Sequence, residues 1–153
     1  MPEISTSIYM TAPAGRVWEV LTDPDRYGDW NAMHTGFPNV VPALAAGAKF
    51  REAVSLMGYP SQLAWTVVQF EPPRVWSMDG RGPMGVTMQQ CYALSEKGGG
   101  TTLSAHVVFA GAAIGFMASR LEQATASVMS ESLRHLAALV PDDPQTPDTN
   151  VEG

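Results

Sequence analysis

The chain has 153 residues, of which 45% are hydrophobic and only 16% are charged, so it can bury one sizeable core. Its net charge of −6 repels phosphate backbones, and we therefore expect no nucleic-acid partner. Cys91 is the single cysteine, which excludes an internal disulfide. No signal peptide and no apolar run of about 18 residues is present, so we expect a cytoplasmic protein without a membrane span.

The N-terminal third predicts a strand followed by two short helices. Residues 3–11 alternate apolar and polar side chains, which is typical of a strand with one buried face. Pro13 suits a first helical turn, the apolar residues after it recur at helical spacing, and a second short helix is predicted over 24–32. Residues 35–47 are rich in Gly and Pro and predict a connection with a short edge strand near Val40.

The middle of the chain predicts a series of antiparallel strands, because turn signals separate short alternating segments. The predicted strands are 49–57, 62–70, 74–80, 84–96 and 101–110. The glycines at 98–100 predict a hairpin turn and not a phosphate-binding loop, since a strand follows them instead of a helix.

The C-terminal part predicts one long helix over 112–140, because its apolar residues form a single stripe at helical spacing. A one-sided helix of this length needs a sheet to lie on. We therefore expect an α+β fold, with a curved antiparallel sheet of six or seven strands around the long helix and two short helices after the first strand. Residues 1–140 are predicted to form a single domain, and the acidic, Pro-rich residues 141–153 a disordered tail.

Four segments carry a resemblance that covers residues 3–140: APAGRVWEVLTDPDRYGDW (12–30), WTVVQFEPPRVWSM (65–78), YALSEKGGGTTLSAHVVF (92–109) and the long final helix. In these segments the chain resembles the SRPBCC superfamily, the START/Bet v 1-like helix-grip fold. The motifs WNAMHTGF and FEPPR resemble an actinobacterial polyketide cyclase/dehydrase-like subgroup. One mycobacterial member of that subgroup is labelled the toxin of a type II toxin–antitoxin pair. The resemblance implies a helix-grip fold but no single function, because this fold hosts many activities.

Strand alternation predicts which side chains face a cavity between the sheet and the long helix. The concave faces are mostly apolar with a few polar groups, which is typical of a small-molecule site. The 27–37 loop adds aromatic side chains, predicted to form the lid and rim of that cavity. The candidate ligand-binding residues are Tyr27, Trp30, His34, Phe37, Phe50, Glu52, Val54, Trp65, Val67, Gln69, Trp76, Met78, Met88, Gln90, Tyr92, Met117, Leu121, Ala124 and Val128.

The candidate catalytic residues are Glu52, His34 and Tyr92. An inward Glu52 either reaches the rim or pairs with an arginine, or it is a ligand-facing acid or base with a raised pKa. His34 is either a proton donor at the cavity mouth or a histidine that caps a loop. His106 falls on the solvent face of its strand. No histidine pair has metal-ligand spacing, so we expect neither a metal nor a cofactor.

Three functions follow as hypotheses. The first is a binder of a small hydrophobic molecule, such as a lipid, a fatty acyl chain or a polyketide-like aromatic. The second is a polyketide cyclase or aromatase. In aromatase-type relatives this chemistry uses cavity Arg and Tyr residues, and no inward arginine is found here. The third is the toxin of a toxin–antitoxin pair, which would have an antitoxin partner. A homodimer is compatible with the sequence.

Overall fold

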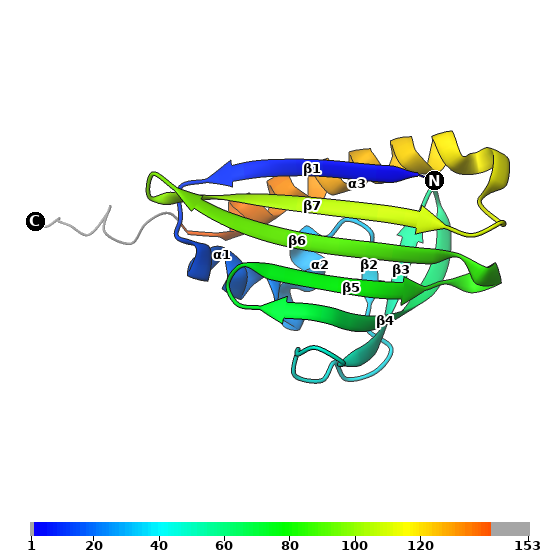
Figure 1. Cartoon of the computed structure of the whole chain (residues 1–153), viewed down its shortest axis with the longest axis horizontal. Helices are drawn as coiled ribbons and strands as arrows, with labels where there is room; N and C mark the ends of the chain where they lie inside the picture. The colour runs from blue at the N-terminus through cyan, green and yellow to red at the C-terminus, as the bar shows by residue number, and fades with distance from the viewer. Residues whose placement is uncertain (1, 142–153) are drawn as a thin grey trace, which may run out of the picture.

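The computed structural model describes residues 2–141, so the predicted tail lies outside the described residues from position 142 onward. A seven-stranded antiparallel sheet runs in the order β1-β7-β6-β5-β4-β3-β2 (Figure 1). The strands are β1 (Glu3–Met10), β2 (His34–Gly36), β3 (Lys49–Leu56), β4 (Tyr59–Glu71), β5 (Val75–Arg81), β6 (Thr87–Lys97) and β7 (Gly100–Ala110).

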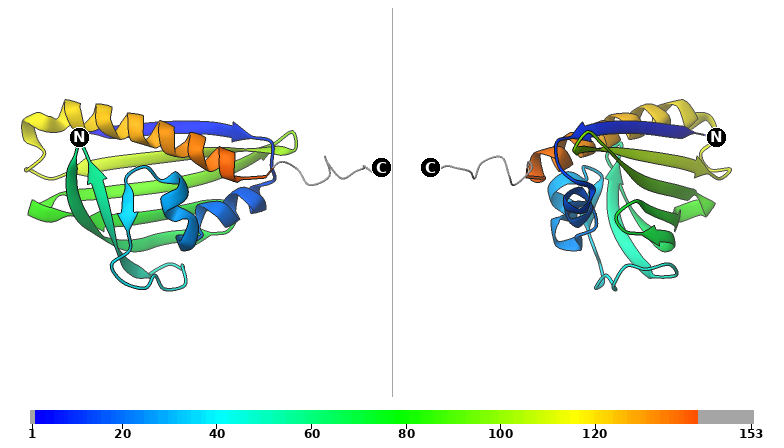
Figure 2. Two further views of the ribbon diagram at one scale, coloured as in Figure 1. Left: turned by 180° about the vertical axis from the view of Figure 1, so that it is seen from behind. Right: turned by 60° about the vertical axis from the view of Figure 1, so that its left-hand side comes forward.

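The sheet curves around one long helix, which the views from behind and from the side show (Figure 2). The helices are α1 (Ala14–Leu21), η1 (Pro24–Arg26), α2 (Tyr27–Trp30), η2 (Pro83–Gly85), η3 (Gly115–Met117) and α3 (Ala118–Leu139). This arrangement confirms the predicted helix-grip fold. Helix α3 packs on β1 and α2, so it covers the concave face of the sheet. No helix of the described residues is long and apolar enough to cross a membrane.

Three predicted element boundaries are wrong for local backbone reasons. The long helix begins at residue 118 and not at 112, because Gly111 (φ +129°) and Gly115 (φ +44°) take positive-φ conformations before it. A side chain at Gly111 would also meet the Gly85 carbonyl oxygen at 2.8 Å. Strand β6 begins at residue 87 and not at 84, since Met84 lies in η2 at φ 60°. The edge strand is His34–Gly36 and not a segment near Val40.

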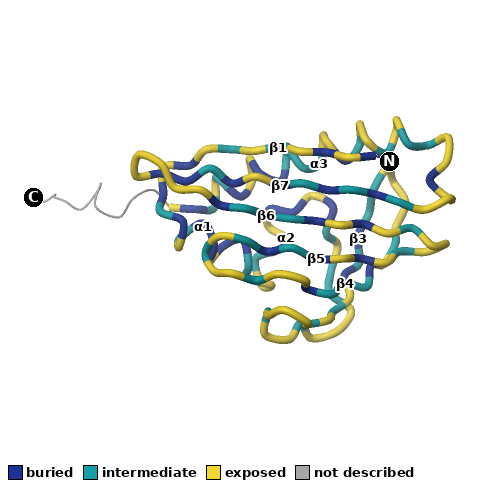
Figure 3. The backbone as a smooth tube through the Cα atoms, in the orientation of Figure 1, coloured by how far each residue is buried: buried dark blue, intermediate teal, exposed yellow. Residues whose placement is uncertain are grey.

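Buried and exposed residues alternate along the strands as predicted, with one exception in β4 (Figure 3). The pairing of β4 with β5 shifts between Val67 and Gln69, so an extra residue bulges there. Beyond this bulge the alternation is inverted. Val68 is exposed, and Phe70 turns inward and contacts the Trp18 ring at 5.2 Å between centroids. The prediction that Gln69 faces the concave side is therefore wrong, because Gln69 is exposed.

Candidate functional site

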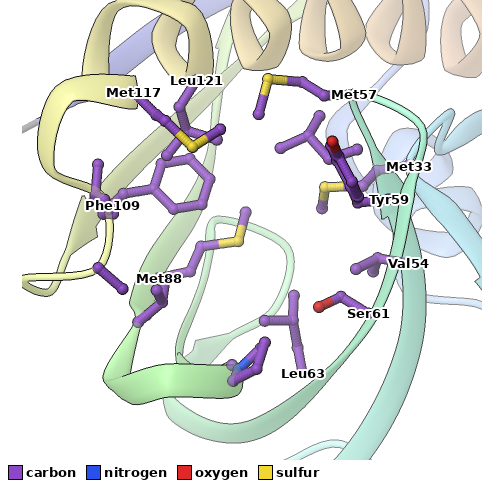
Figure 4. A pocket seen from close by; sticks show the side chains of 16 residues that line it. Met33, Val54, Met57, Tyr59, Ser61, Leu63, Met88, Phe109, Met117 and Leu121 are labelled. Carbon is purple, nitrogen blue, oxygen red and sulfur yellow. The ribbon is translucent and has the colours of Figure 1, made fainter.

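An apolar cavity opens at the end of the sheet where β5 leads into β6 and β7 leads into α3. Its volume is about 220 Å³, and only the hydroxyls of Tyr59 and Ser61 interrupt its apolar side chains. We call it the outer cavity (Figure 4). It is lined by Met33, Val54, Leu56, Met57, Tyr59, Ser61, Leu63, Gly82, Pro83, Val86, Met88, Phe109, Ala113, Ile114, Met117 and Leu121.

Three connections build the walls of the outer cavity. The β3–β4 turn places Met57 and Tyr59 at one side, and its tightness requires positive φ at both Met57 (54°) and Gly58 (80°). The η2 and η3 segments form two further walls, and Leu121 enters from the first turns of α3. The side chains that meet here are mostly methionine, leucine and valine, which leave a space that aromatic rings fill elsewhere.

A second, smaller cavity lies deeper, between the sheet and the middle of α3. Its volume is about 30 Å³, and we call it the inner chamber. Met33 and Met88 line both cavities, so these two side chains form the wall between them. The inner chamber is lined by Trp30, Asn31, Met33, Met88, Gln90, Tyr92, Ala105, Val107, Thr125, Val128, Met129, Ser132 and Leu133.

Hydrogen bonds hold the tyrosine at the inner chamber. The Gln90 amide donates to the Tyr92 hydroxyl oxygen. The Tyr27 hydroxyl lies near that of Tyr92, since each tyrosine affects the pKa of the other. Burial raises the pKa of both tyrosines well above the ordinary value, and the nearby Glu52 carboxylate raises each pKa further. Both hydroxyls therefore stay neutral and able to donate at physiological pH.

Two residues of the inner chamber carry polar atoms without a partner. Among the described residues, the Trp30 Nε1 and Thr125 Oγ1 atoms are buried and make no hydrogen bond. The same holds for Trp76 Nε1, although Trp76 does not line the inner chamber. Ser132, one turn beyond Val128 in α3, differs because its hydroxyl accepts the Ala32 N–H and donates to the Val128 carbonyl. A buried donor without a partner loses its hydration and gains nothing in return. The inner chamber therefore has two lining residues, Trp30 and Thr125, whose buried polar atoms lack a hydrogen-bond partner.

The Glu52 carboxylate is buried and has two partners. The His34 Nδ1 atom lies 2.7 Å from Oε2, and the Trp65 indole N–H donates to Oε1 at 2.8 Å. Gly80 permits this position of Trp65, because a side chain there would meet the indole ring at 2.7 Å. Glu52 thus points inward as predicted, but it neither reaches the rim nor pairs with an arginine. Its partner is His34, which lies on the adjacent strand β2.

The aromatic residues of the 27–37 segment fill space and do not form an open rim. Tyr27 and Trp30 are 4% and 1% exposed, and their rings meet edge to face at 5.0 Å. The Tyr27 ring also contacts the rings of His34 and Phe37 at centroid distances of 5.0 and 5.6 Å. The predicted lid and rim form a packed aromatic cluster in the structure, because the Trp76 and Tyr92 rings of the sheet contact Tyr27 and Trp30.

The predicted site residues fall into four groups in the structure. Those on the outer cavity are Val54, Met88, Met117 and Leu121. Those on the inner chamber are Trp30, Met88, Gln90, Tyr92 and Val128. Those around a void of only about 10 Å³ are Tyr27, Phe37, Phe50 and Trp76. Those on none of these interior spaces are His34, Glu52, Trp65, Val67, Gln69, Met78 and Ala124.

Sequence reasoning missed Thr125 and most of the outer-cavity lining as site residues. Thr125 lies four residues after Leu121, so a polar residue next to the apolar stripe was a readable signal. Tyr59, Pro83 and Ala113 gave no comparable signal, because their exposure to a cavity depends on how three separate connections meet.

A groove of about 650 Å³ lies on the opposite, convex face of the sheet. Strand pairing aligns Arg51, Ala64 and Arg81 in one row across β3, β4 and β5, and Lys49, Thr66 and Asp79 in the next. The four charged residues are exposed, and no ion pair among the described residues involves them. This groove therefore gathers three of the nine basic residues of an acidic chain on one solvent-facing surface.

The donor set for a metal is weak throughout the described part of the chain. Residues 2–141 contain no group of three or more His, Cys, Asp or Glu side chains that could hold a metal ion. His106 pairs with Glu3 at 2.6 Å on the surface, as its predicted solvent face requires. The interior cavities therefore offer hydrogen bonds and apolar contact and not coordination chemistry.

Comparison with known proteins places this geometry in a family. Residues 1–141 match the family described as "Polyketide cyclase / dehydrase and lipid transport". Two Mycobacterium tuberculosis proteins, named Toxin Rv0910 and Toxin MT0934, are 28% identical over 115 residues, which cover 74% of this chain and 80% of each relative. The crystal structure of CV1439 from Chromobacterium violaceum has the same fold, with a TM-score of 0.71 at 21% identity over 92% of this chain and 99% of that one. The chain therefore belongs to the polyketide cyclase/dehydrase and lipid transport family.

Proposed function

We propose that the protein binds a small hydrophobic molecule in the outer cavity. The observation that carries this proposal is an apolar cavity of about 220 Å³ between the sheet and α3, without a charged side chain in its lining. Apolar surface that a ligand removes from water there contributes roughly 25 cal/mol per Å² before the cost of association. The cavity is therefore suited to a ligand that gains its affinity from burial.

Two further observations support a ligand of variable shape. Met33, Met57, Met88 and Met117 line the outer cavity, and methionine side chains adapt to different shapes because they are unbranched and polarizable. The family description includes both lipid transport and polyketide chemistry. We therefore propose lipids, fatty acyl chains and polyketide-like aromatics as the ligand classes.

The test is native mass spectrometry of the protein purified from its own host, followed by extraction of any bound molecule. We expect a stoichiometric hydrophobic compound in the wild-type protein and its absence in Val54→Phe, which fills the outer cavity. Calorimetric titration of the extracted compound into the apo protein should show a negative heat-capacity change, which marks apolar burial. A clean apo mass together with no uptake of apolar probes would reject the proposal.

A second candidate is a polyketide cyclase, and the position of Tyr92 favours it. Of the three candidate catalytic residues, only Tyr92 lines an interior cavity, whereas Glu52 and His34 are paired outside both cavities. A neutral tyrosine hydroxyl can donate to a carbonyl oxygen and promote proton transfer at the adjacent carbon. If this is the function, Tyr92→Phe lowers turnover of a poly-β-keto substrate at least about 100-fold. Unchanged turnover in that variant would reject the cyclase candidate and leave ligand binding as the proposed function.

A third candidate is the toxin of a toxin–antitoxin pair, which binds a partner protein such as an antitoxin, because two relatives are named toxins. The convex groove favours an acidic partner segment, since Arg51 and Arg81 flank the small Ala64 and offer planar, forked donors to carboxylates. Affinity capture with proteins encoded beside this chain, using wild type and Arg51→Glu/Arg81→Glu, tests this candidate. Size-exclusion chromatography of the same samples distinguishes such a partner from a homodimer.

A further inference from the structure

We propose that the inner chamber is a subsite for a neutral hydrogen-bond acceptor, such as a ketone oxygen, on the ligand whose apolar body occupies the outer cavity. This inference rests on the proposed function, because it assigns the orientation and chemical class of the same ligand. It concerns Thr125, Trp30 and Tyr92, which share one chamber from three different elements.

The first argument is the kind of polar groups that meet in the chamber. The Trp30 indole can only donate, and the Thr125 hydroxyl can donate or accept. Neither atom has a partner among the described residues, although the two residues are 1% and 2% exposed. The Tyr92 oxygen accepts a hydrogen bond from the Gln90 amide, and a hydroxyl that accepts in this way still has its own proton to donate. Three residues that can donate a hydrogen bond therefore line one small space, and an acceptor oxygen satisfies them best.

The second argument is the absence of positive charge. Within the described residues, neither the outer cavity nor the inner chamber is lined by Lys, Arg or His. The Glu52 carboxylate lies close enough to Tyr92 to raise its pKa, so a second negative charge at this place is opposed. A carboxylate would lose its hydration without a counter-ion, whereas a ketone carries no such penalty. The subsite thus selects neutral acceptors over acids.

The third argument is size and access. The chamber of about 30 Å³ has room for a carbonyl group but not for a ring system, whereas the outer cavity of about 220 Å³ holds a larger apolar body. The wall between them consists of Met33 and Met88, whose thioether chains change rotamer easily. A ligand that enters the outer cavity can therefore pass its oxygen between these two side chains.

The experiment is calorimetric titration with three matched probes of similar shape: acetylnaphthalene, ethylnaphthalene and naphthoic acid. The wild-type protein should bind acetylnaphthalene about three- to ten-fold more tightly than ethylnaphthalene, and naphthoic acid most weakly. The isosteric variant Thr125→Val should bring acetylnaphthalene down to the level of ethylnaphthalene without changing the latter. Tyr92→Phe should act in the same direction.

A stability measurement guards against a merely structural effect of Thr125→Val. The substitution removes a buried hydroxyl without a partner, so the apo protein should keep or gain thermal stability while it loses affinity for the ketone. Equal binding of acetylnaphthalene and ethylnaphthalene by wild type and variant overturns the subsite but leaves the outer-cavity function intact. Tightest binding of naphthoic acid overturns the neutral-acceptor assignment. Failure of every probe, together with an apo protein from the native host, overturns the proposed function itself.

Discussion

The two ends of the space under α3 are built from the same sheet and helix but filled in opposite ways. Around α2 and β2, the rings of Tyr27, Trp30, Phe37 and Trp76 pack against one another. Around η2 and η3, methionine and leucine side chains leave about 220 Å³ open. Close packing of rings makes the first end a rigid support, whereas at the second end the rings of Tyr59 and Phe109 line the space without filling it. The position of the aromatic residues, and not the fold alone, decides where a ligand can bind.

The buried polar groups differ in whether they have a hydrogen-bond partner. At the packed end the buried carboxylate of Glu52 is fully engaged by His34 and Trp65. Unpartnered buried polar atoms lie on Thr125 and Trp30 at the inner chamber, and one more lies on Trp76 within the packed aromatic cluster. Satisfied polar groups stabilise the fold, whereas unsatisfied ones cost stability and are retained more easily where they serve binding.

The largest expected effect breaks the packed end. His34→Ala removes one partner of a buried carboxylate, and such a loss typically costs about 3–5 kcal/mol of unfolding free energy. Urea unfolding of the variant measures this cost. The double variant His34→Leu/Glu52→Leu serves as the control, because it removes the charge together with its partner and should recover more than half of the loss. A single variant as stable as wild type would contradict the described pair.

The second prediction compares the same substitution at a position that lines the outer cavity and at a packed core position. Val54 and Val67 are both buried strand valines, but only Val54 lines the outer cavity. Val67→Phe should overpack the core and lower the unfolding free energy by about 1–3 kcal/mol, whereas Val54→Phe should be nearly neutral because the ring enters open space. Thermal unfolding of the two proteins compares them directly. Equal destabilisation would mean that no cavity exists beside Val54.

The third prediction concerns alkaline pH. Burial raises the pKa of Tyr27 and Tyr92 in the folded protein above the value of about 10 that an unfolded chain has. Above about pH 10 the unfolded chain releases these protons and the folded protein retains them, so the unfolding free energy falls by up to about 1.4 kcal/mol per pH unit for each tyrosine. Below that pH the contribution is fully present. Urea unfolding at increasing pH should show a shallower decline for Tyr92→Phe than for wild type, and identical slopes would contradict the burial argument.

The smallest expected effect concerns the convex groove, which lies on the opposite face of the sheet from both cavities. Arg51→Glu/Arg81→Glu changes two exposed residues of the convex groove, so stability should change by no more than about 0.5 kcal/mol per site. Uptake of acetylnaphthalene should also remain unchanged, since neither arginine lines an interior cavity. A lost affinity for that probe in this variant would show that the outer cavity is not the binding site.

Much of the fold was predictable from the sequence, because alternation and helical spacing are local signals. The inward direction of Glu52 followed from strand alternation and is confirmed by its 1% exposure. Its partner was not predictable, since His34 approaches only through the irregular pairing of β2 with β3. Gln69 was misplaced because a bulge leaves no clear mark in the sequence.

The location of the cavity was beyond local reasoning for a related reason. The aromatic residues at 27–37 resembled a rim, but whether rings fill a space depends on neighbours such as Trp76 and Tyr92 from distant strands. The outer cavity exists because Met57, Met88 and Met117, far apart in the chain, meet around a space that the rings of Tyr59 and Phe109 do not close. Such an absence has no signature in any single segment.

The measurement that tests the central claim most directly is NMR spectroscopy of methyl-labelled methionines during titration with acetylnaphthalene. Met57, Met88 and Met117 line the outer cavity, whereas Met10 and Met78 are buried but line neither the outer cavity nor the inner chamber. If the open end is the binding site, the first three methyl signals shift strongly with saturation and the other two barely move. Shifts confined to Met10 and Met78, or no saturable shift at any methionine, would contradict the account.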